Sequence, residues 1–239
     1  MSPSNCLIII PAYNEQDSVA EVIAKARAHA PDSDFVVVDD GSSDDTAAVV
    51  SRCGVPVLRL PCNLGYARAV QTGIKYALKK GYDTVVLLDG DGQHNPEDVV
   101  SLRSALEQEK ADVVIGSRFV GNRKLTGPLG RRLGMWLFAW VTFLATGTRI
   151  YDTTSGFKAV SRRAYEKLSS EQFVDFHAEA LVCLSLAGMK IAERPVAMAE
   201  RRSGRSMYNW LSHFKYPLKT MLLIIISVFR ANFGGGNRQ

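Results

Sequence analysis

Two aspartates and a glutamine follow an apolar stretch in the first half of the chain. Residues 85–88 are Val-Val-Leu-Leu, and Asp89, Asp91 and Gln93 come directly after them, with a glycine behind each acid. Four consecutive apolar residues predict a strand buried on both faces, as in a parallel sheet. The glycines favour a turn that keeps both carboxylates near the carboxyl edge of that sheet. Carboxylate and amide oxygens suit Mg²⁺ or Mn²⁺, and the alternative is an acidic turn that caps the next helix.

Strands and helices are expected to alternate around these acids. Further apolar runs predict strands at 7–10, 35–38, 55–60 and 112–115, and helix-spaced apolar residues lie between them. Five alternations at βαβ lengths, with right-handed crossovers, predict an α/β fold with an open, mostly parallel sheet in an α/β/α sandwich. Neither a dinucleotide-binding glycine motif nor a P-loop occurs, so metal and arginine are expected to hold any nucleotide phosphates.

Composition and cysteine usage are those of an intracellular globular protein. The chain has 239 residues, of which 46% are hydrophobic and 22% charged, enough for one large core. The four cysteines show no metal-binding spacing and are expected to be reduced, as in a cytosolic setting. The first residues lack the features of a signal peptide, so we expect the catalytic part to face the cytoplasm.

The basic residues are concentrated at the C-terminus. Residues 201–239 hold seven Lys or Arg and no Asp or Glu, in a chain whose net charge is +5. This imbalance predicts an anionic partner for the segment, which could be phosphate, lipid headgroups or nucleic acid.

Two apolar segments stand out from the predicted catalytic domain at 1–205. The helix predicted at 128–146 holds two tryptophans and is too short to cross a bilayer, which takes about 20 apolar residues. It is either a core helix or an interfacial helix. The helix predicted at 206–232 is basic and amphipathic and then wholly apolar, which favours a membrane surface or docking on the catalytic domain or a partner chain. Residues 233–239 are expected to form a disordered tail.

Seven short motifs run in order along the chain. They are Pro11-Ala-Tyr-Asn-Glu15, Val38-Asp-Asp-Gly-Ser42, Asn63-Leu-Gly65, Asp89-Gly-Asp-Gly-Gln93, Gly116-Ser-Arg118, Thr154-Ser-Gly-Phe157 and Arg201-x-x-Gly204-x-Ser206. With them the chain resembles the inverting family 2 glycosyltransferases of GT-A fold. Within that family it is most similar to the branch of dolichyl-phosphate mannosyltransferase, whose members make polyprenyl-phosphate sugars. Each motif is weak alone, but seven in the family order are specific.

The resemblance implies a nucleotide-sugar pocket and a metal site. The residues that would bind the nucleotide sugar are Pro11, Tyr13, Glu15, Asp39, Asp40, Asp89, Gly90, Asp91 and Arg201. Asp39 and Asp40 would accept hydrogen bonds from the base or ribose, unless they only cap a helix. Mg²⁺ or Mn²⁺ on Asp89, Asp91 and Gln93 would bridge the diphosphate and neutralise the charge of the leaving nucleotide.

The resemblance also implies an acceptor site. Arg118, Arg131 and Arg132 would hold the acceptor phosphate, with Ser155 beside them, since the guanidinium fork suits that anion. Asp91, Arg118 and Arg131 would then form the catalytic set. The alternative for the arginines is a solvated basic loop.

Two departures from the family pattern bear on the function. Met207 stands where the family often has Lys, so Arg205 or a flexible loop must compensate. Family members that glycosylate a sugar hydroxyl carry a Glu-Asp pair whose Asp is the general base, and here those positions are Phe176 and His177. A hydroxyl needs such a base, whereas a phosphate monoester is already ionised at pH 7. The loss favours a phosphate acceptor and leaves His177 as either a base or a packed side chain; Asp175 and Glu179 remain candidates for binding the sugar or the acceptor.

The sequence therefore predicts a peripheral enzyme at the cytoplasmic face of a membrane. It would move one hexose from a UDP- or GDP-sugar to a polyprenyl phosphate such as undecaprenyl or dolichyl phosphate. The membrane surface, an integral-membrane protein or a second copy of the chain are the other partners considered, and nucleic acid is not expected. One alternative is transfer to a sugar or protein hydroxyl with His177 as the base. Another is a non-catalytic nucleotide-sugar-binding subunit, which would not need the intact Asp89 and Asp91 pair.

Overall fold

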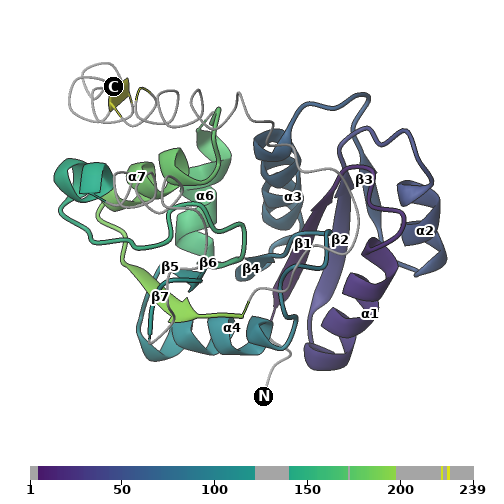
Figure 1. Cartoon of the computed structure of the whole chain (residues 1–239), viewed down its shortest axis with the longest axis horizontal. Helices are drawn as coiled ribbons and strands as arrows, with labels where there is room; N and C mark the ends of the chain where they lie inside the picture. The colour runs from purple at the N-terminus through teal and green to yellow at the C-terminus, as the bar shows by residue number, and fades with distance from the viewer. Residues whose placement is uncertain (1–4, 122–139, 172, 198–221, 223–224, 227–239) are drawn as a thin grey trace.

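The core of the protein is one seven-stranded sheet with helices on both faces (Figure 1). The computed structural model describes residues 5–121, 140–171, 173–197, 222, 225 and 226. The strands are β1 (Cys6–Ala12), β2 (Asp34–Asp39), β3 (Val57–Arg59), β4 (Thr84–Leu87), β5 (Val113–Ser117), β6 (Lys158–Ser161) and β7 (Ile191–Pro195). They lie in the order β3-β2-β1-β4-β6-β5-β7.

The direction of the strands confirms the predicted mostly parallel sheet. β6 runs antiparallel to its neighbours β4 and β5, and the other four pairings are parallel. The sequence predicts β1 to β5 but neither β6 nor β7. β6 has four residues and begins at Lys158, and β7 contains Glu193 and Arg194, so neither has the apolar run that identifies a buried strand.

The central strands are buried on both faces. In β1, Ile8 and Ile10 belong to one core cluster and Leu7 and Ile9 to the other. Successive side chains of a strand point to opposite faces, so an unbroken apolar run is required when helices cover both sides.

The helices form two outer layers and confirm the predicted α/β/α sandwich. They are α1 (Val19–His29), α2 (Thr46–Arg52), α3 (Tyr66–Lys80), α4 (Asp98–Gln108), α6 (Arg162–Ser170) and α7 (Ala178–Leu186). Residues of α1, α2 and α4 pack in the first core cluster, and those of α3, α6 and α7 in the second. Residues 140–146 are also helical, and Val141 and Ala145 pack against α7.

The two apolar segments are described only in part. Residues 140–146 are the described end of the helix predicted at 128–146, and Leu222, Ile225 and Ile226 are the described residues of the segment 206–232. The tail 233–239 lies outside the described residues, so these predictions stay predictions. In the part of the chain that the structure describes, no helix combines the length and the apolar character needed to cross a bilayer.

Candidate active site

The predicted motifs that follow β1, β2 and β4 meet at the carboxyl edge of the sheet. Pro11 lies near the end of β1, Asp39 is the last residue of β2, and Asp89 follows β4. The Ser18 hydroxyl joins two of these ends, because its oxygen is 2.8 Å from both the Glu15 carboxylate and the Gly90 carbonyl. Parallel strands bring their carboxyl ends to one edge, which is where ligands bind in such sheets.

Asn14 ties the loop after β1 to the loop after β2. Its N–H donates to the Ser42 hydroxyl at 2.9 Å, and its side-chain oxygen accepts from the Ser43 N–H at 2.9 Å. Asn14 adopts a positive φ of 54°, a conformation that asparagine tolerates better than most residues. Tyr13, the residue before Asn14, is exposed at this edge of the sheet.

Asp39, at the end of β2, contacts an arginine that lines a cavity. Its Oδ1 accepts the Ser42 N–H at 2.9 Å, while its buried Oδ2 has no hydrogen-bond partner and lies 3.2 Å from Arg59 Nε. The Arg59 contact is close enough for an ion pair but lacks hydrogen-bond geometry. The cavity measures about 340 Å³ and is lined by Gly41, Ser42, Arg59, Leu60 and Pro61. Arg59 thus lines the cavity and also contacts the buried Asp39 carboxylate behind it.

Asp40 is engaged inside the protein. Its two oxygens accept the backbone N–H groups of Leu64 and Gly65, both at 2.8 Å. Burial raises the pKa of Asp40, although these two hydrogen bonds lower it. The geometry makes Asp40 the residue that fixes the loop leading into α3, and its contact with a base or ribose stays a prediction.

The two acids after β4 and their glutamine lie together as the spacing predicts. Asp91 is buried, and its Oδ1 accepts the Gln93 N–H at 3.0 Å. Asp89 Oδ2 is 3.2 Å from His94 Nε2, and Asp89 Oδ1 is buried without a hydrogen-bond partner. Gly156 lies directly against the Asp89 carboxylate, where a Cβ would overlap with both oxygens. This contact explains the glycine of the Thr154–Phe157 motif.

Positive and neutral groups keep the Asp89 carboxylate ionised. Burial raises the pKa of Asp89. The hydrogen bond to His94 and the electrostatic effects of His94, His177 and Lys158 outweigh burial and lower this pKa below the ordinary value. Lys158, the first residue of β6, is buried and donates to the Ser155 carbonyl. Burial lowers the pKa of Lys158 to about 8, against the opposing effect of Asp89, Asp152 and Asp175.

Tyr66 and His177 form a stacked pair at this site. The sequence marks His177 as a base or a packed side chain but does not single out Tyr66. Their ring centroids are 4.8 Å apart and the rings are 16° from parallel. The Tyr66 hydroxyl and His177 Nδ1 are buried without hydrogen-bond partners. Burial and then Lys158 lower the pKa of His177, so its ring is neutral at physiological pH. The signal for Tyr66 was its position directly after the Asn63–Gly65 motif.

Arg118 has a firm partner at the end of β5. Its Nε and one Nη donate to the two oxygens of Asp152 at 2.8 and 2.7 Å, and the same Nη donates to the Thr154 hydroxyl at 2.6 Å. Ser155 is buried and donates to the Gly116 carbonyl at 2.7 Å. Both residues therefore hold the loop 152–157, and their contact with an acceptor stays a prediction.

The positions around the start of α7 divide between the core and the site. Phe176 is buried in the core, where it meets Phe173 edge to face. Glu179 accepts the N–H groups of Val174 and Asp175 at 2.9 and 3.0 Å, so it fixes the loop before α7. Asp175 Oδ1 in turn accepts the His177 N–H at 2.7 Å.

Several predicted site residues cannot be placed. Arg131, Arg132, Arg201 and Met207 lie outside the described residues. Their roles therefore stay predictions of the sequence.

The acids after β4 fit a divalent ion only as part of its coordination shell. Among the described residues, no three His, Cys, Asp or Glu side chains group as a metal site. Asp89, Asp91 and Gln93 offer two carboxylates and an amide, and Asp89 Oδ1 has no hydrogen-bond partner among the described residues. This set suits Mg²⁺ or Mn²⁺ with diphosphate oxygens as the other ligands.

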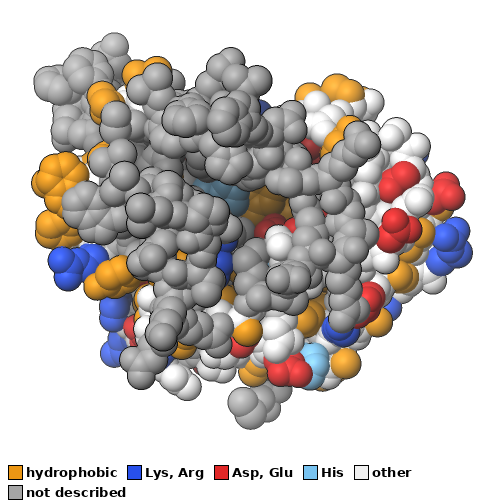
Figure 2. All heavy atoms as spheres, viewed as in Figure 1, with side chains coloured by type: hydrophobic (Ala, Val, Ile, Leu, Met, Phe, Trp, Pro, Cys, Tyr) orange, Lys and Arg blue, Asp and Glu red, His pale blue; other side chains and the backbone are white. Residues whose placement is uncertain are grey.

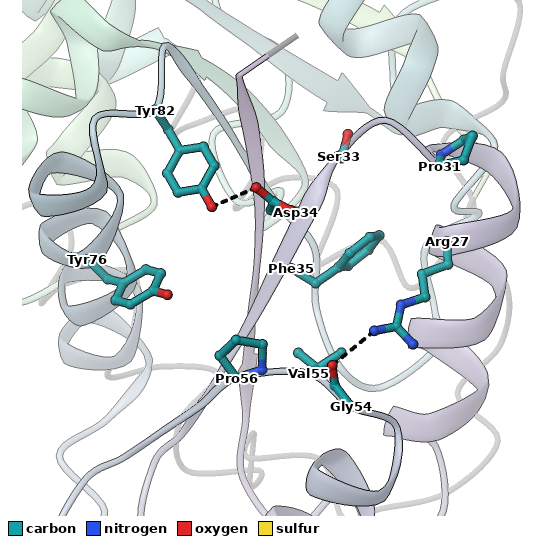
Figure 3. Close-up of a pocket in the computed structure, with 10 residues that line it drawn as sticks. All are labelled: Arg27, Pro31, Ser33, Asp34, Phe35, Gly54, Val55, Pro56, Tyr76 and Tyr82. Carbon is teal, nitrogen blue, oxygen red and sulfur yellow. Dashed lines mark hydrogen bonds between the residues drawn. The ribbon is translucent and has the colours of Figure 1, made fainter. Parts of the chain in front are cut away.

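A cavity larger than the one at Arg59 lies at the opposite, amino edge of the sheet (Figure 3). It measures about 480 Å³, and its lining includes Arg27, Asp34, Phe35, Tyr76 and Tyr82. The Tyr82 hydroxyl donates to Asp34 at 2.8 Å, and Arg27 donates to the Cys53 carbonyl at 2.7 Å. The predicted site residues do not line it.

Comparison with known proteins gives one family. Residues 7–169 match the model of glycosyl transferase family 2. An undecaprenyl-phosphate mannosyltransferase of Micrococcus luteus is 30% identical over 210 residues, which cover 84% of this chain and 86% of that protein. A UDP-N-acetylglucosamine–dolichyl-phosphate N-acetylglucosaminyltransferase of Methanococcus voltae is 29% identical over 210 residues, covering 79% and 83%.

A solved structure shares the fold. Glucosyl-3-phosphoglycerate synthase from Mycobacterium tuberculosis, in complex with Mn²⁺ and UDP-glucose, aligns with a TM-score of 0.65 at 20% identity. The alignment covers 95% of this chain and 78% of that one. The likeness confirms the predicted fold class.

Proposed function

The chain belongs to glycosyl transferase family 2, and on that basis we propose that it moves a hexose from a nucleoside diphosphate sugar to a polyprenyl phosphate at a membrane surface. The names of two relatives support this acceptor, since one acts on undecaprenyl phosphate and the other on dolichyl phosphate. The same two proteins transfer different sugars, so the donor is proposed only as a UDP- or GDP-sugar.

The observation that carries this proposal is the absence of a carboxylate at the two positions before α7. Phe176 is packed in the core, and the neutral His177 ring is stacked on Tyr66. A phosphate monoester attacks the anomeric carbon without a base, because it is already ionised at neutral pH.

The donor side follows from the described residues. The nucleobase of the donor lies in the cavity lined by Arg59, next to Asp39. The diphosphate of the donor extends from there toward Asp89 and Asp91. When bound there with Gln93, Mg²⁺ or Mn²⁺ supplies the positive charge that stabilises the leaving nucleoside diphosphate. Lys158 and His94 keep Asp89 ionised for that task.

The acceptor side rests on Arg118. Asp152 and Thr154 hold its guanidinium in one orientation, so its positive charge faces the acceptor phosphate from a fixed place. The family resemblance predicts that Arg131 and Arg132 add positive charge there and that Arg201 contacts the donor diphosphate. A fixed cation loses little conformational entropy when the phosphate binds.

An apolar face beside the site supports a membrane location. Trp140, Phe143 and Leu144 are exposed on the helix whose other side packs against α7. Figure 2 shows hydrophobic side chains on this flank of the molecule, with Lys or Arg side chains next to them. Aromatic and basic residues together are typical of surfaces that lie at lipid headgroups.

The second function considered is transfer to a sugar or protein hydroxyl. One observation favours it: His177 is neutral, and its buried Nδ1 has no hydrogen-bond partner, so it could accept a proton. In that case replacing His177 with Gln would abolish transfer, whereas a phosphate acceptor would need no proton removed at this position.

The test is transfer of labelled sugar from a panel of UDP- and GDP-sugars to polyprenyl phosphate in detergent. Mg²⁺ or Mn²⁺ is supplied, and a chelator is the control. We expect a lipid-linked product that the chelator abolishes and that the His177→Gln variant still makes. Donor hydrolysis without a lipid product would contradict the acceptor proposal and favour the hydroxyl alternative.

A further inference from the structure

The hydroxyl of Tyr66 is a buried polar group beside the Asp89 carboxylate. Tyr66 is the first residue of α3, and its hydroxyl oxygen has no hydrogen-bond partner of good geometry among the described residues. Burying a hydroxyl without a partner destabilises a protein, and native structures keep few such groups. A residue that merely packed here could be phenylalanine.

The surroundings of this hydroxyl point to a ligand. It lies within interaction distance of the Asp89 carboxylate, although no hydrogen bond of good geometry joins them and Asp89 Oδ1 is also buried without a hydrogen-bond partner. The Tyr66 ring is stacked on His177, whose Nδ1 is a third such atom. A tyrosine hydroxyl keeps its proton at neutral pH and can act as a hydrogen-bond donor.

Carboxylates fix the backbone next to both rings of the stacked pair. Asp40 accepts the N–H groups of Leu64 and Gly65, directly before Tyr66. On the other side, Asp175 accepts the N–H of His177. The backbone next to each ring is thus anchored by a carboxylate, which keeps the Tyr66 hydroxyl in place before any ligand arrives. Such preorganisation is expected of a binding group rather than of a packing residue.

We propose that Tyr66 is a donor-contacting residue whose hydroxyl donates a hydrogen bond to an oxygen of the sugar-diphosphate part of the donor, next to Asp89. This inference rests on the proposed use of a nucleoside diphosphate sugar at this site. The hydrogen bond strengthens as negative charge develops on the leaving diphosphate, because hydrogen bonds to charged oxygens are the stronger ones. His177 supports the ring of Tyr66 by stacking.

The test is the Tyr66→Phe variant of the full chain, which keeps the ring and its stack and removes one oxygen. Three quantities are measured: the Tm of the ligand-free protein, binding of UDP- and GDP-sugars with Mn²⁺ by calorimetry, and transfer to polyprenyl phosphate. We expect an unchanged or slightly higher Tm, and donor binding or kcat/KM reduced about tenfold or more, the effect of one lost hydrogen bond to a charged group.

Tyr76→Phe is the matched control. Tyr76 lies on the same helix, but it lines the cavity at the amino edge of the sheet. We expect this variant to bind donor and transfer sugar as the wild type does.

Two results would overturn the inference. The first is a Tyr66→Phe variant that binds and turns over the donor like the wild type. The second is a Tm lowered by several degrees, which would mean that the hydroxyl bonds within the protein, for example to Asp89. If the wild type makes no lipid product but Tyr66→Phe still weakens donor binding, the acceptor proposal fails and the role of Tyr66 stands.

Discussion

The candidate site and the cavity at the amino edge differ in how their buried polar groups are satisfied. At the site, five buried polar atoms have no hydrogen-bond partner among the described residues: Asp39 Oδ2, Tyr66 Oη, Asp89 Oδ1, His94 Nδ1 and His177 Nδ1. At the amino edge, no residue lining the cavity of Figure 3, all of them in the described part of the chain, carries such an atom. There Tyr82 bonds to Asp34, and Arg27 bonds to the carbonyl of Cys53.

This difference distinguishes a ligand-binding site from a cavity that has no ligand to bind. The amino edge has the larger cavity, about 480 Å³ against about 340 Å³ beside Asp39, yet its polar groups are satisfied by the protein itself. Unsatisfied polar atoms cost stability, so a fold is expected to keep them only where a ligand completes them. On this view, substitutions at the carboxyl edge affect transfer, and substitutions at the amino edge affect at most stability.

The largest effect on transfer is expected from Asp91→Asn. This change removes one negative charge from the set that holds the metal and the diphosphate, and we expect transfer to fall by about a hundredfold to a thousandfold. Asp34→Asn at the amino edge is the control and should keep transfer within about twofold, since it alters one exposed hydrogen bond. Labelled-sugar transfer and Tm are measured for both. A low Tm for Asp91→Asn would mean that the acid is structural.

Gly156→Ala tests the effect of a steric overlap at the site, and Gly73→Ala tests the effect of a similar overlap in the core. The added Cβ would collide with the Asp89 carboxylate and displace it, and we expect transfer to fall about a hundredfold because a small misplacement of a reacting group has that effect. Gly73→Ala is a matched control, since its Cβ would collide with Ile9 in the core. It should lower the free energy of unfolding by about 1–3 kcal/mol and leave transfer per folded molecule unchanged.

The Arg118–Asp152 pair predicts a pH effect on stability. Burial raises the pKa of Asp152, but the hydrogen bonds and charge of Arg118 outweigh it and hold that pKa below the ordinary 3.8. Asp152 therefore stabilises the fold above pH 3.8, and this stabilisation is lost as the pH falls through its folded-state pKa. We expect Asp152→Asn to cost about 2 kcal/mol at neutral pH, and the difference from the wild type to narrow in acid.

The control for that pH profile is an exposed ion pair at the amino edge. Arg162 and Asp83 are 3.7 Å apart and largely exposed, so Asp83→Asn should leave the free energy of unfolding close to that of the wild type at any pH. A constant gap between wild type and Asp152→Asn down to the most acid pH would contradict the assignment.

The sequence predicts the frame of the fold because its strongest signals are local. The runs in β1, β2, β4 and β5 are apolar on both faces, and the carboxyl ends of parallel strands must meet at one edge. The short strands β6 and β7 escape such reasoning, since each contains charged residues and owes its place to its neighbours. Lys158 is the clearest case, because a buried lysine in a strand depends on distant carboxylates.

The site is predicted less well than the fold for a related reason. Sequence motifs mark Asp40, Arg118 and Ser155 as polar residues of the right type, but the structure shows that their polar atoms bond to Gly65, Asp152 and Gly116. Motif membership does not distinguish a group that contacts a ligand from one that positions a loop. Tyr66 and His177 lie 111 positions apart in the sequence, and only the packing of α3 near α7 could reveal their stack.

The smallest effect is expected from Tyr82→Phe, which removes a tyrosine hydroxyl at the amino edge. This hydroxyl bonds to Asp34 at 2.8 Å in an exposed setting, so we expect the free energy of unfolding to fall by about 0.5–1 kcal/mol and transfer to stay unchanged. Tyr66→Phe removes the same atom at the carboxyl edge and should do the reverse, leaving stability intact and reducing transfer. Denaturant unfolding and labelled-sugar transfer measured on both variants decide the matter. If Tyr82→Phe reduced transfer as strongly as Tyr66→Phe, hydrogen-bond satisfaction would not distinguish the functional edge from the structural one.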